Sequence, residues 1–264
     1  MRKSPFLRAV LIFTLVAIIV PMLLIALWSF TARWPWPSLI PTKMSLRTVN
    51  DVLFSSSKLF KLLWSSFILA VSTAVISTVI GLMTARATEL YSIRGKKLVY
   101  FGSLLPLLIP GTVFTIGIHI ALIRIGLSDT VAGVLLVHIV SAVPYCITIM
   151  TDLTAAVGDH LEEQAMVLGA PPLTAFFSAS LPQLMPGILS SMSMAFILSY
   201  SQYFTTLLIG GGRVKTLALV LVPYIQSGDR SLASVYSIVY VGSALLIFFI
   251  LEYLMHLSRK RSEA

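Results

Sequence analysis

One apolar stretch of the chain contains a short run of hydroxyl and amide side chains. Residues 199–206 read Ser-Tyr-Ser-Gln-Tyr-Phe-Thr-Thr, inside a segment otherwise apolar enough to cross a membrane. Unpaired polar groups are costly in lipid, so such residues usually contact a neighbouring helix or a water-filled cavity. At helical spacing one face carries Ser199, Gln202, Tyr203 and Thr206. We predict that this face forms either a solute path or an interhelical hydrogen-bond network, and the sequence leaves both open.

The residue types that support catalysis do not form a known enzyme pattern. The sequence has no G-x-S-x-G, H-E-x-x-H or G-x-x-x-x-G-K-[ST] motif. His119 and His138 are single histidines in apolar segments, and the one cysteine, Cys146, fits a small packing residue. We therefore predict that the chain is not an enzyme and holds neither a metal nor a cofactor.

A second polar region, residues 152–186, has the pattern of two short helices joined by a break. Asp159 and Glu162 have the spacing of a capping box, which satisfies the free backbone donors at a helix start. Gly169 follows where a left-handed C-terminal cap is expected, and two prolines end the helix there. The second helix is expected over Pro172–Leu181. On physical grounds this is an amphipathic surface element that lies on lipid or docks into a partner.

The composition of the chain indicates where these elements must lie. Of its 264 residues 57% are hydrophobic and 11% are charged, whereas an ordinary soluble domain carries roughly 25% charged residues. The excess apolar surface requires lipid, and the net charge of +9 then fits anionic lipid rather than nucleic acid. No linker or low-complexity tract divides the chain. We predict a single membrane domain, residues 1–264, that contacts lipid and no nucleic acid.

Six segments have the roughly 20 mostly apolar residues that a helix needs to cross a bilayer. They are Ala9–Trp28, Leu62–Ala85, Val99–Leu122, Val131–Met150, Ile188–Ile209 and Leu232–Met255. We predict an all-α integral membrane bundle of six helices, with Pro182 and Pro186 turning the chain into the fifth. Both termini then lie on one side. Their basic residues favour the cytoplasm, although basic residues in the first long loop weaken that argument.

The polar region 152–186 also carries a spaced motif. It consists of Glu163-Gln164-Ala165, three residues, Gly169, nine residues and Ala179-Ser180-Leu181-Pro182. This resembles the EAA loop of binding-protein-dependent ABC transporter permeases, whose pattern is E-A-A, three residues, G, nine residues, I-x-L-P. The spacing matches throughout, while Gln164 and Ala179 replace the usual Ala and Ile. The chain is similar to type I importer permeases of the polyamine, thiamine and iron group, and the likeness extends to Leu104-Leu105-Pro106, Pro110-Gly111, His138 and Pro144.

The resemblance implies a permease subunit of an ATP-driven importer in the bacterial inner membrane, with both termini cytoplasmic. Its partners would be a cytoplasmic ABC ATPase dimer, a second permease subunit and an extracytoplasmic substrate-binding protein. ATP and Mg²⁺ would bind the ATPase and not this chain. The loop of about residues 152–186 would be the coupling loop. The expected ATPase-coupling residues are Glu162, Glu163, Ala165, Leu168, Gly169, Ala170, Leu181 and Pro182.

Two features depart from the family pattern. No Lys or Arg occurs from Asp152 to Pro186, where family members often carry basic residues, so docking would depend on apolar contact and on Glu162 and Glu163. The position like Gln202 is often acidic in permeases that carry cations, and the neutral amide argues against a polyamine or bare metal cargo. The alternative function is a secondary transporter or channel without an ATPase. Such proteins place ionisable residues deep in the bundle, and the middles of these spans carry almost none.

Overall fold

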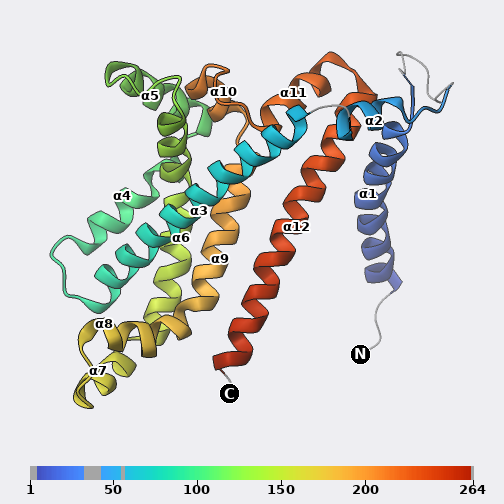
Figure 1. The fold of residues 1–264 in the computed structure, drawn as a ribbon. Helices are drawn as coiled ribbons and strands as arrows, with labels where there is room; N and C mark the ends of the chain where they lie inside the picture. Colours follow the sequence, from blue (N-terminus) through green and yellow to red (C-terminus); the bar gives the residue numbers. More distant parts are fainter. Residues whose placement is uncertain (1–4, 33–42, 55–56, 263–264) are drawn as a thin grey trace. The chain divides into compact units, whose positions relative to one another are not determined.

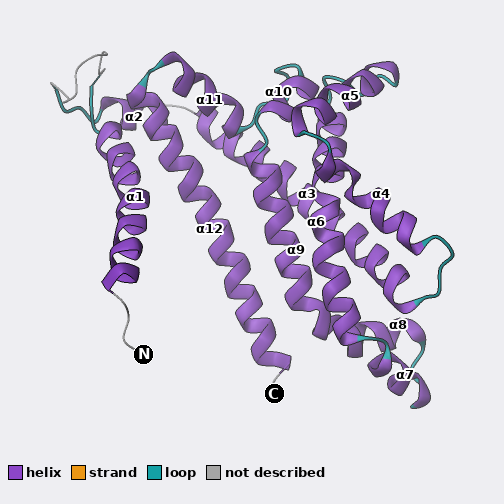
Figure 2. Cartoon of the chain, turned by 180° about the vertical axis from the view of Figure 1, so that it is seen from behind, coloured by secondary structure: helices purple, strands orange, loops and turns teal. Residues whose placement is uncertain are grey.

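The computed structural model describes residues 5–32, 43–54 and 57–262 (Figure 1). These residues form helices joined by turns, and their β-structure is a single bridge between Thr31 and Met44 (Figure 2). In chain order the helices are α1 (Pro5–Ser29), α2 (Arg47–Leu53), α3 (Ser57–Leu90), α4 (Lys96–Leu108), α5 (Gly111–Arg124), α6 (Val131–Val157), α7 (His160–Val167), α8 (Pro172–Ala175), the π-helical turn η1 (Phe176–Ser180), α9 (Leu181–Ser201), α10 (Phe204–Gly210), α11 (Leu217–Ser227) and α12 (Arg230–Ser262).

The predicted all-α membrane architecture is confirmed. Helices α1, α3, α6 and α12 contain the predicted first, second, fourth and sixth spans, and each is long and apolar enough to cross a membrane. A fifth such helix extends over Pro172–Ser201. Among the described residues, the bent pair of α4 and α5 gives a sixth span if the two are counted as one. The short apolar helix α11 was not predicted.

The third span is not the straight helix expected over Val99–Leu122. The chain bends by 107° between α4 and α5. Proline disfavours the helical conformation of the residue before it, and Ile109 accordingly has an extended ψ of 132° ahead of Pro110. Pro110 itself continues extended, with ψ of 129°. The bend therefore follows from Pro110. The uniform hydropathy of the segment gives no sign of it.

The fifth span differs from the prediction at both ends. It begins at Pro172, and Pro182 continues the helix rather than re-aiming the chain. The π-helical turn η1 ends at Ser180, and the N–H of Leu181, the residue before Pro182, donates to the carbonyl of Phe176. At the other end α9 stops at Ser201, and Gln202 is extended, with ψ of 100°. The helix predicted over Ile188–Ile209 is thus interrupted at Gln202.

The chain divides into two compact units, which we describe separately. The first contains Met1–Leu63 and Leu217–Ser243. Its apolar core joins residues of α2, the start of α3, α11 and α12: Val52, Leu59, Leu62, Leu217, Leu221, Val235 and Tyr236. The rings of Tyr224 and Tyr236 stack with centroids 5.3 Å apart, and the hydroxyls of Thr31 and Ser231 lie 3.2 Å apart.

The second unit contains Trp64–Thr216 and Ala244–Ala264 and holds both predicted functional regions. Helix α3 packs closely on α6, because a Cβ added at Gly81 would lie 2.7 Å from Cβ of Cys146. Cys146 is fully buried there, which confirms its role as a small packing residue. At one end of this unit α7 and α8 follow the last turn of α6 and precede α9 (Figure 1).

Candidate functional site

Helix α7 ends in a glycine cap, as predicted from the sequence. Gly169 has φ of +92°, a conformation that only glycine adopts without strain. The Gly169 N–H donates to Met166 O at 2.9 Å and the Ala170 N–H donates to Ala165 O at 3.0 Å. These two bonds form a Schellman motif, which satisfies the last carbonyl groups of the helix. Ala165, Gly169 and Ala170 therefore shape the end of α7.

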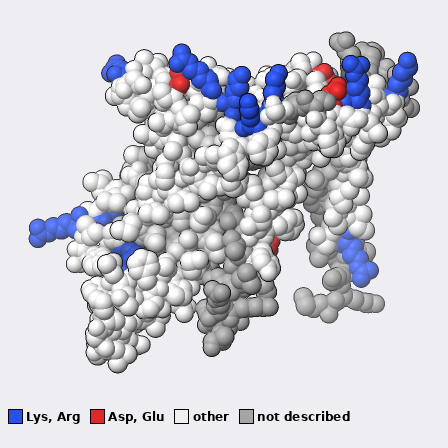
Figure 3. All heavy atoms as spheres, viewed as in Figure 1, with Lys and Arg blue, Asp and Glu red and all other residues white. Residues whose placement is uncertain are grey.

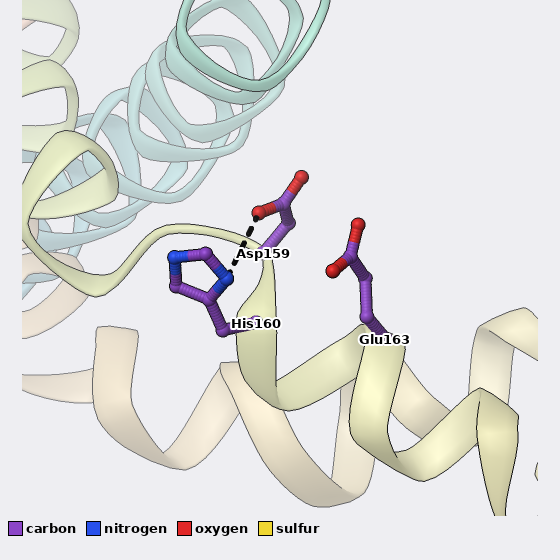
Figure 4. Close-up of side chains that lie close together, drawn as sticks. All are labelled: Asp159, His160 and Glu163. Atoms are coloured by element: carbon purple, nitrogen blue, oxygen red, sulfur yellow. Dashed lines mark ion pairs between the residues drawn. The ribbon is translucent and has the colours of Figure 1, made fainter.

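The start of α7 does not use the predicted capping box. Asp159 occupies the position before the helix, but its side chain accepts no hydrogen bond from the first turn. Its φ and ψ, −110° and −5°, lie outside the extended region that a capping side chain requires. The Asp159 carboxylate instead lies 4.0 Å from Nδ1 of His160 (Figure 4).

Glu162 is held within the chain by a residue that sequence analysis did not connect with it. Arg86, near the end of α3, donates from Nη1 and Nη2 to the two carboxylate oxygens of Glu162, at 2.7 and 2.9 Å. The Arg86 guanidinium also lies 4.6 Å from the ring centroid of Phe176, the first residue of η1. The hydrogen bonds from Arg86 lower the pKa of Glu162, against the opposing effect of burial. The side chain of Glu162 is therefore mostly enclosed, with 13% exposed, and is bonded to α3.

The outer surface of α7 is an exposed apolar ridge with a polar border. Val167 is 87% exposed and Leu168 is 88% exposed. They line one wall of an open groove of about 550 Å³, whose border is formed by His160, Glu163 and Gln164. On the face shown in Figure 3, the atoms over α7 and α8 are not basic, while Lys and Arg appear near the turn between α3 and α4 and, in larger number, along the upper edge of the view. Of the predicted coupling residues, Glu163 and Leu168 line this groove, whereas Leu181 and Pro182 lie at the start of α9, outside its lining.

Three side chains at the start of α7 have the residue types of metal ligands. Potential ligand atoms of Asp159, His160 and Glu163 lie within 4.8 Å of one another (Figure 4). His160 and Glu163 are exposed to solvent and Asp159 is half-buried. Asp159, His160 and Glu163 come from a single helix start, where close spacing along the chain already brings such groups together. His160 and Glu163 also line the groove, so we assign these two side chains to its polar border.

The polar side chains of the segment 199–206 lie in two different environments. Ser199 and Thr206 are buried and lie on opposite sides of the ring of His138, 2.8 Å from Nδ1 and 3.1 Å from Nε2. The Ser199 hydroxyl donates to Thr73 of α3 at 3.2 Å. Thr206 donates to the carbonyl of Gln202 at 2.7 Å, which satisfies an oxygen near the helix interruption. Ser199 and Thr206 thus form the interhelical network, and this half of the predicted face is structural.

Gln202 faces a cavity instead. The cavity has a volume of about 420 Å³, and its lining contains no Asp, Glu, Lys, Arg or His. Its polar side chains come from α5, α6 and the interrupted fifth span: Thr112, Thr115, Ser141, Tyr145, Gln202 and Thr205. Tyr203, the fourth residue of the predicted face, is half-buried and does not line it. The interruption at Gln202 therefore places one amide in a neutral, hydroxyl-rich cavity.

Known proteins with similar sequences are transport permeases. The molybdate/tungstate transport system permease protein WtpB of Pyrococcus abyssi is 28% identical over 213 residues, 81% of this chain and 83% of that protein. The putrescine transport system permease protein PotI of Escherichia coli is 24% identical over 271 residues, 98% of this chain and 94% of that protein.

A solved structure and a family model agree with these similarities. One chain of a bacterial ABC transporter involved in the import of the acidic polysaccharide alginate shares the fold, with a TM-score of 0.65 at 15% identity, and the match covers 96% of this chain and 98% of that chain. The family model for binding-protein-dependent transport system inner membrane components matches residues 77–263, which include α7, its groove and the His138 network. The chain therefore belongs to the family of binding-protein-dependent transport system inner membrane components.

Proposed function

We propose that this permease subunit imports a small solute with a separate cytoplasmic ABC ATPase dimer that binds the groove of α7. ATP and Mg²⁺ bind that ATPase. A second permease subunit, identical or homologous, completes the path, and an extracytoplasmic binding protein delivers the solute. The chain acts as one membrane domain in a bacterial inner membrane, with α7 and both termini in the cytoplasm.

The exposed ridge of Val167 and Leu168 is the observation that carries this proposal. Two large apolar side chains this exposed at the end of a surface helix are characteristic of a protein-binding site. The open groove is lined by the apolar Val167 and Leu168 and by the polar His160, Glu163 and Gln164, a mixture that is usual in a site that accepts part of another protein. The Schellman motif fixes the backbone at the end of α7, which lowers the ordering cost of binding at the ridge.

The cavity at Gln202 supports a cargo without net positive charge. A buried cation requires a carboxylate or several carbonyl ligands to replace its water, and the lining residues supply no carboxylate. Hydroxyl and amide groups instead suit a solute rich in hydrogen-bonding oxygens. We therefore propose Gln202 as a contact of the translocation path, with Ser199 and Thr206 supporting the helix interruption beside it.

The test is ATPase binding and ATP-driven import with the permease complex in proteoliposomes. Leu168→Asp places a charge on the ridge, so we expect ATPase affinity to fall about tenfold or more, as for an interface residue worth over 1 kcal/mol. Ser178→Asp is the matched control, because Ser178 is exposed on η1 and does not line the groove. Normal ATPase binding and import by Leu168→Asp would contradict the proposal.

A further inference from the structure

We propose that Arg86 is a positioning residue that ties α7 to the end of α3, so that movement of α7 at the ATPase is transmitted into the membrane bundle. This inference rests on the function proposed above. It adds a role for a residue outside the coupling loop, 76 positions before Glu162 in the sequence.

The Arg86–Glu162 pair is a two-point contact with a fixed geometry, unlike a typical surface ion pair. Both carboxylate oxygens accept from the guanidinium, which fixes the relative orientation of the two side chains as well as their distance. The side chains are only 15% and 13% exposed, so solvent and salt screen them less than surface charges. The Phe176 ring under the guanidinium adds a third contact, on η1.

Helix α7 depends on this link because it has no core of its own. None of its residues is buried. An isolated helix of 8 residues is marginal in water, so α7 depends on contacts with the rest of the chain. Arg86 joins α7 to a 34-residue helix, and through Phe176 it also contacts the turn η1 within the fifth span.

The same helix α3 reaches the interruption at Gln202. Thr73 of α3 accepts a hydrogen bond from Ser199, which in turn lies against His138. Arg86 and Thr73 are separated by thirteen residues, about 20 Å along one uninterrupted helix. A rigid helix with a specific polar contact at each of these positions is a physical route for coupling between α7 and the solute path.

The experiment measures how strongly the binding protein stimulates ATP hydrolysis by the reconstituted complex, a signal that must cross the membrane. Arg86→Gln and Glu162→Gln are each expected to lower this stimulation about fivefold or more, the lower end of coupling between distant sites. The charge-reversed double variant R86E/E162R is expected to restore it. A purely structural role would reduce the amount of assembled complex and leave the stimulation ratio of the assembled fraction unchanged.

The control is Glu89→Gln, which removes the ion pair with Lys96 at the same end of α3. That pair is 3.2 Å long and more exposed, at 44% for Lys96 and 22% for Glu89, and it joins the end of α3 to the start of α4. Glu89→Gln is expected to behave as wild type. If Arg86→Gln fails to assemble, the stimulation of ATP hydrolysis is measured in Arg86→Lys instead. Lysine keeps the positive charge but cannot form the two parallel hydrogen bonds.

Unchanged stimulation in Arg86→Gln, or in Arg86→Lys where that variant decides, overturns the inference. So does loss of stimulation in Glu89→Gln to the same extent. Failure of the wild-type permease to bind the ATPase is a different result, because it contradicts the proposed function itself.

Discussion

The ring of His138 connects the two sides of the interrupted fifth span: Nδ1 lies 2.8 Å from the Ser199 hydroxyl of α9, and Nε2 lies 3.1 Å from Thr206 of α10. A single side chain of α6 thus replaces part of the backbone bonding that a continuous helix would supply. The two buried hydroxyls are paired elsewhere as well, because Ser199 donates to Thr73 and Thr206 donates to the Gln202 carbonyl.

Replacing His138 with leucine should therefore destabilise the purified permease. Because both hydroxyls already donate elsewhere and a neutral imidazole carries one N–H, the substitution removes one buried hydrogen bond, which corresponds to about 1 kcal/mol. His119→Leu is the control, because His119 has one such contact, 3.0 Å from the Ser128 hydroxyl, and is only half-buried. The measurement is thermal unfolding in detergent, and an equal decrease in both variants would argue against the bridging role.

Gln202→Leu should impair import while the complex still assembles with its ATPase. The substitution keeps the size of the side chain but removes the amide from the neutral cavity. Ser201→Leu is the neighbouring control, since Ser201 is exposed and bonded to the Leu198 carbonyl. Uptake of the solute that the binding protein carries is measured in proteoliposomes. An unchanged uptake rate would remove Gln202 from the path, and loss of assembly would make it a structural residue.

Gly169→Asp should abolish transport without removing the permease from the membrane. Any residue with a side chain at φ of +92° is strained by about 1 to 2 kcal/mol, and the new carboxylate lies beside the ridge. Gly95→Asp is the matched control, because Gly95 has φ of +89°, equally open surroundings and no place in α7. Transport and membrane abundance are measured together, and equal transport by the two variants would contradict a special role for the end of α7.

The proposed orientation, with α7 and both termini in the cytoplasm, predicts two opposite labelling results. A cysteine at Ser45 should react with an impermeant thiol reagent in intact cells, whereas one at Ser178 should react only after permeabilisation. Cys146 gives a clean background, since it is fully buried. Labelling of Ser178→Cys in intact cells would reverse the orientation and place α7 outside the cytoplasm.

The Arg86–Glu162 pair should make the mobility of α7 depend on pH. The pKa of Glu162 is lowered in the folded protein, chiefly by the hydrogen bonds from Arg86. Its stabilising contribution is therefore complete above the ordinary pKa of glutamate, about 4.3, and is lost as the pH falls through the lowered value. A spin label at Val167→Cys should become more mobile below about pH 4. The same label in Glu162→Gln should show little dependence on pH over this range.

Sequence reasoning succeeded where the signal is local and failed where it depends on distant residues. Gly169 and the two prolines after it lie within a few positions of one another, so the end of α7 was predictable. Pro110 was visible too, but the even hydropathy around it concealed the 107° bend. No glycine or proline marks the interruption at Gln202. The residues on its two sides contact His138 of another helix, and no local pattern reveals such a contact. The partner of Glu162 lies on α3, so no spacing rule within residues 152–186 could identify Arg86.

The exposed pair Val167 and Leu168 also has a consequence for how the cell regulates the abundance of this protein. A subunit made in excess of its partner leaves this ridge open to water, where apolar side chains attract chaperones and proteases. Orphan copies would then be removed faster than assembled ones, and the supply of the partner would set the amount of permease that persists.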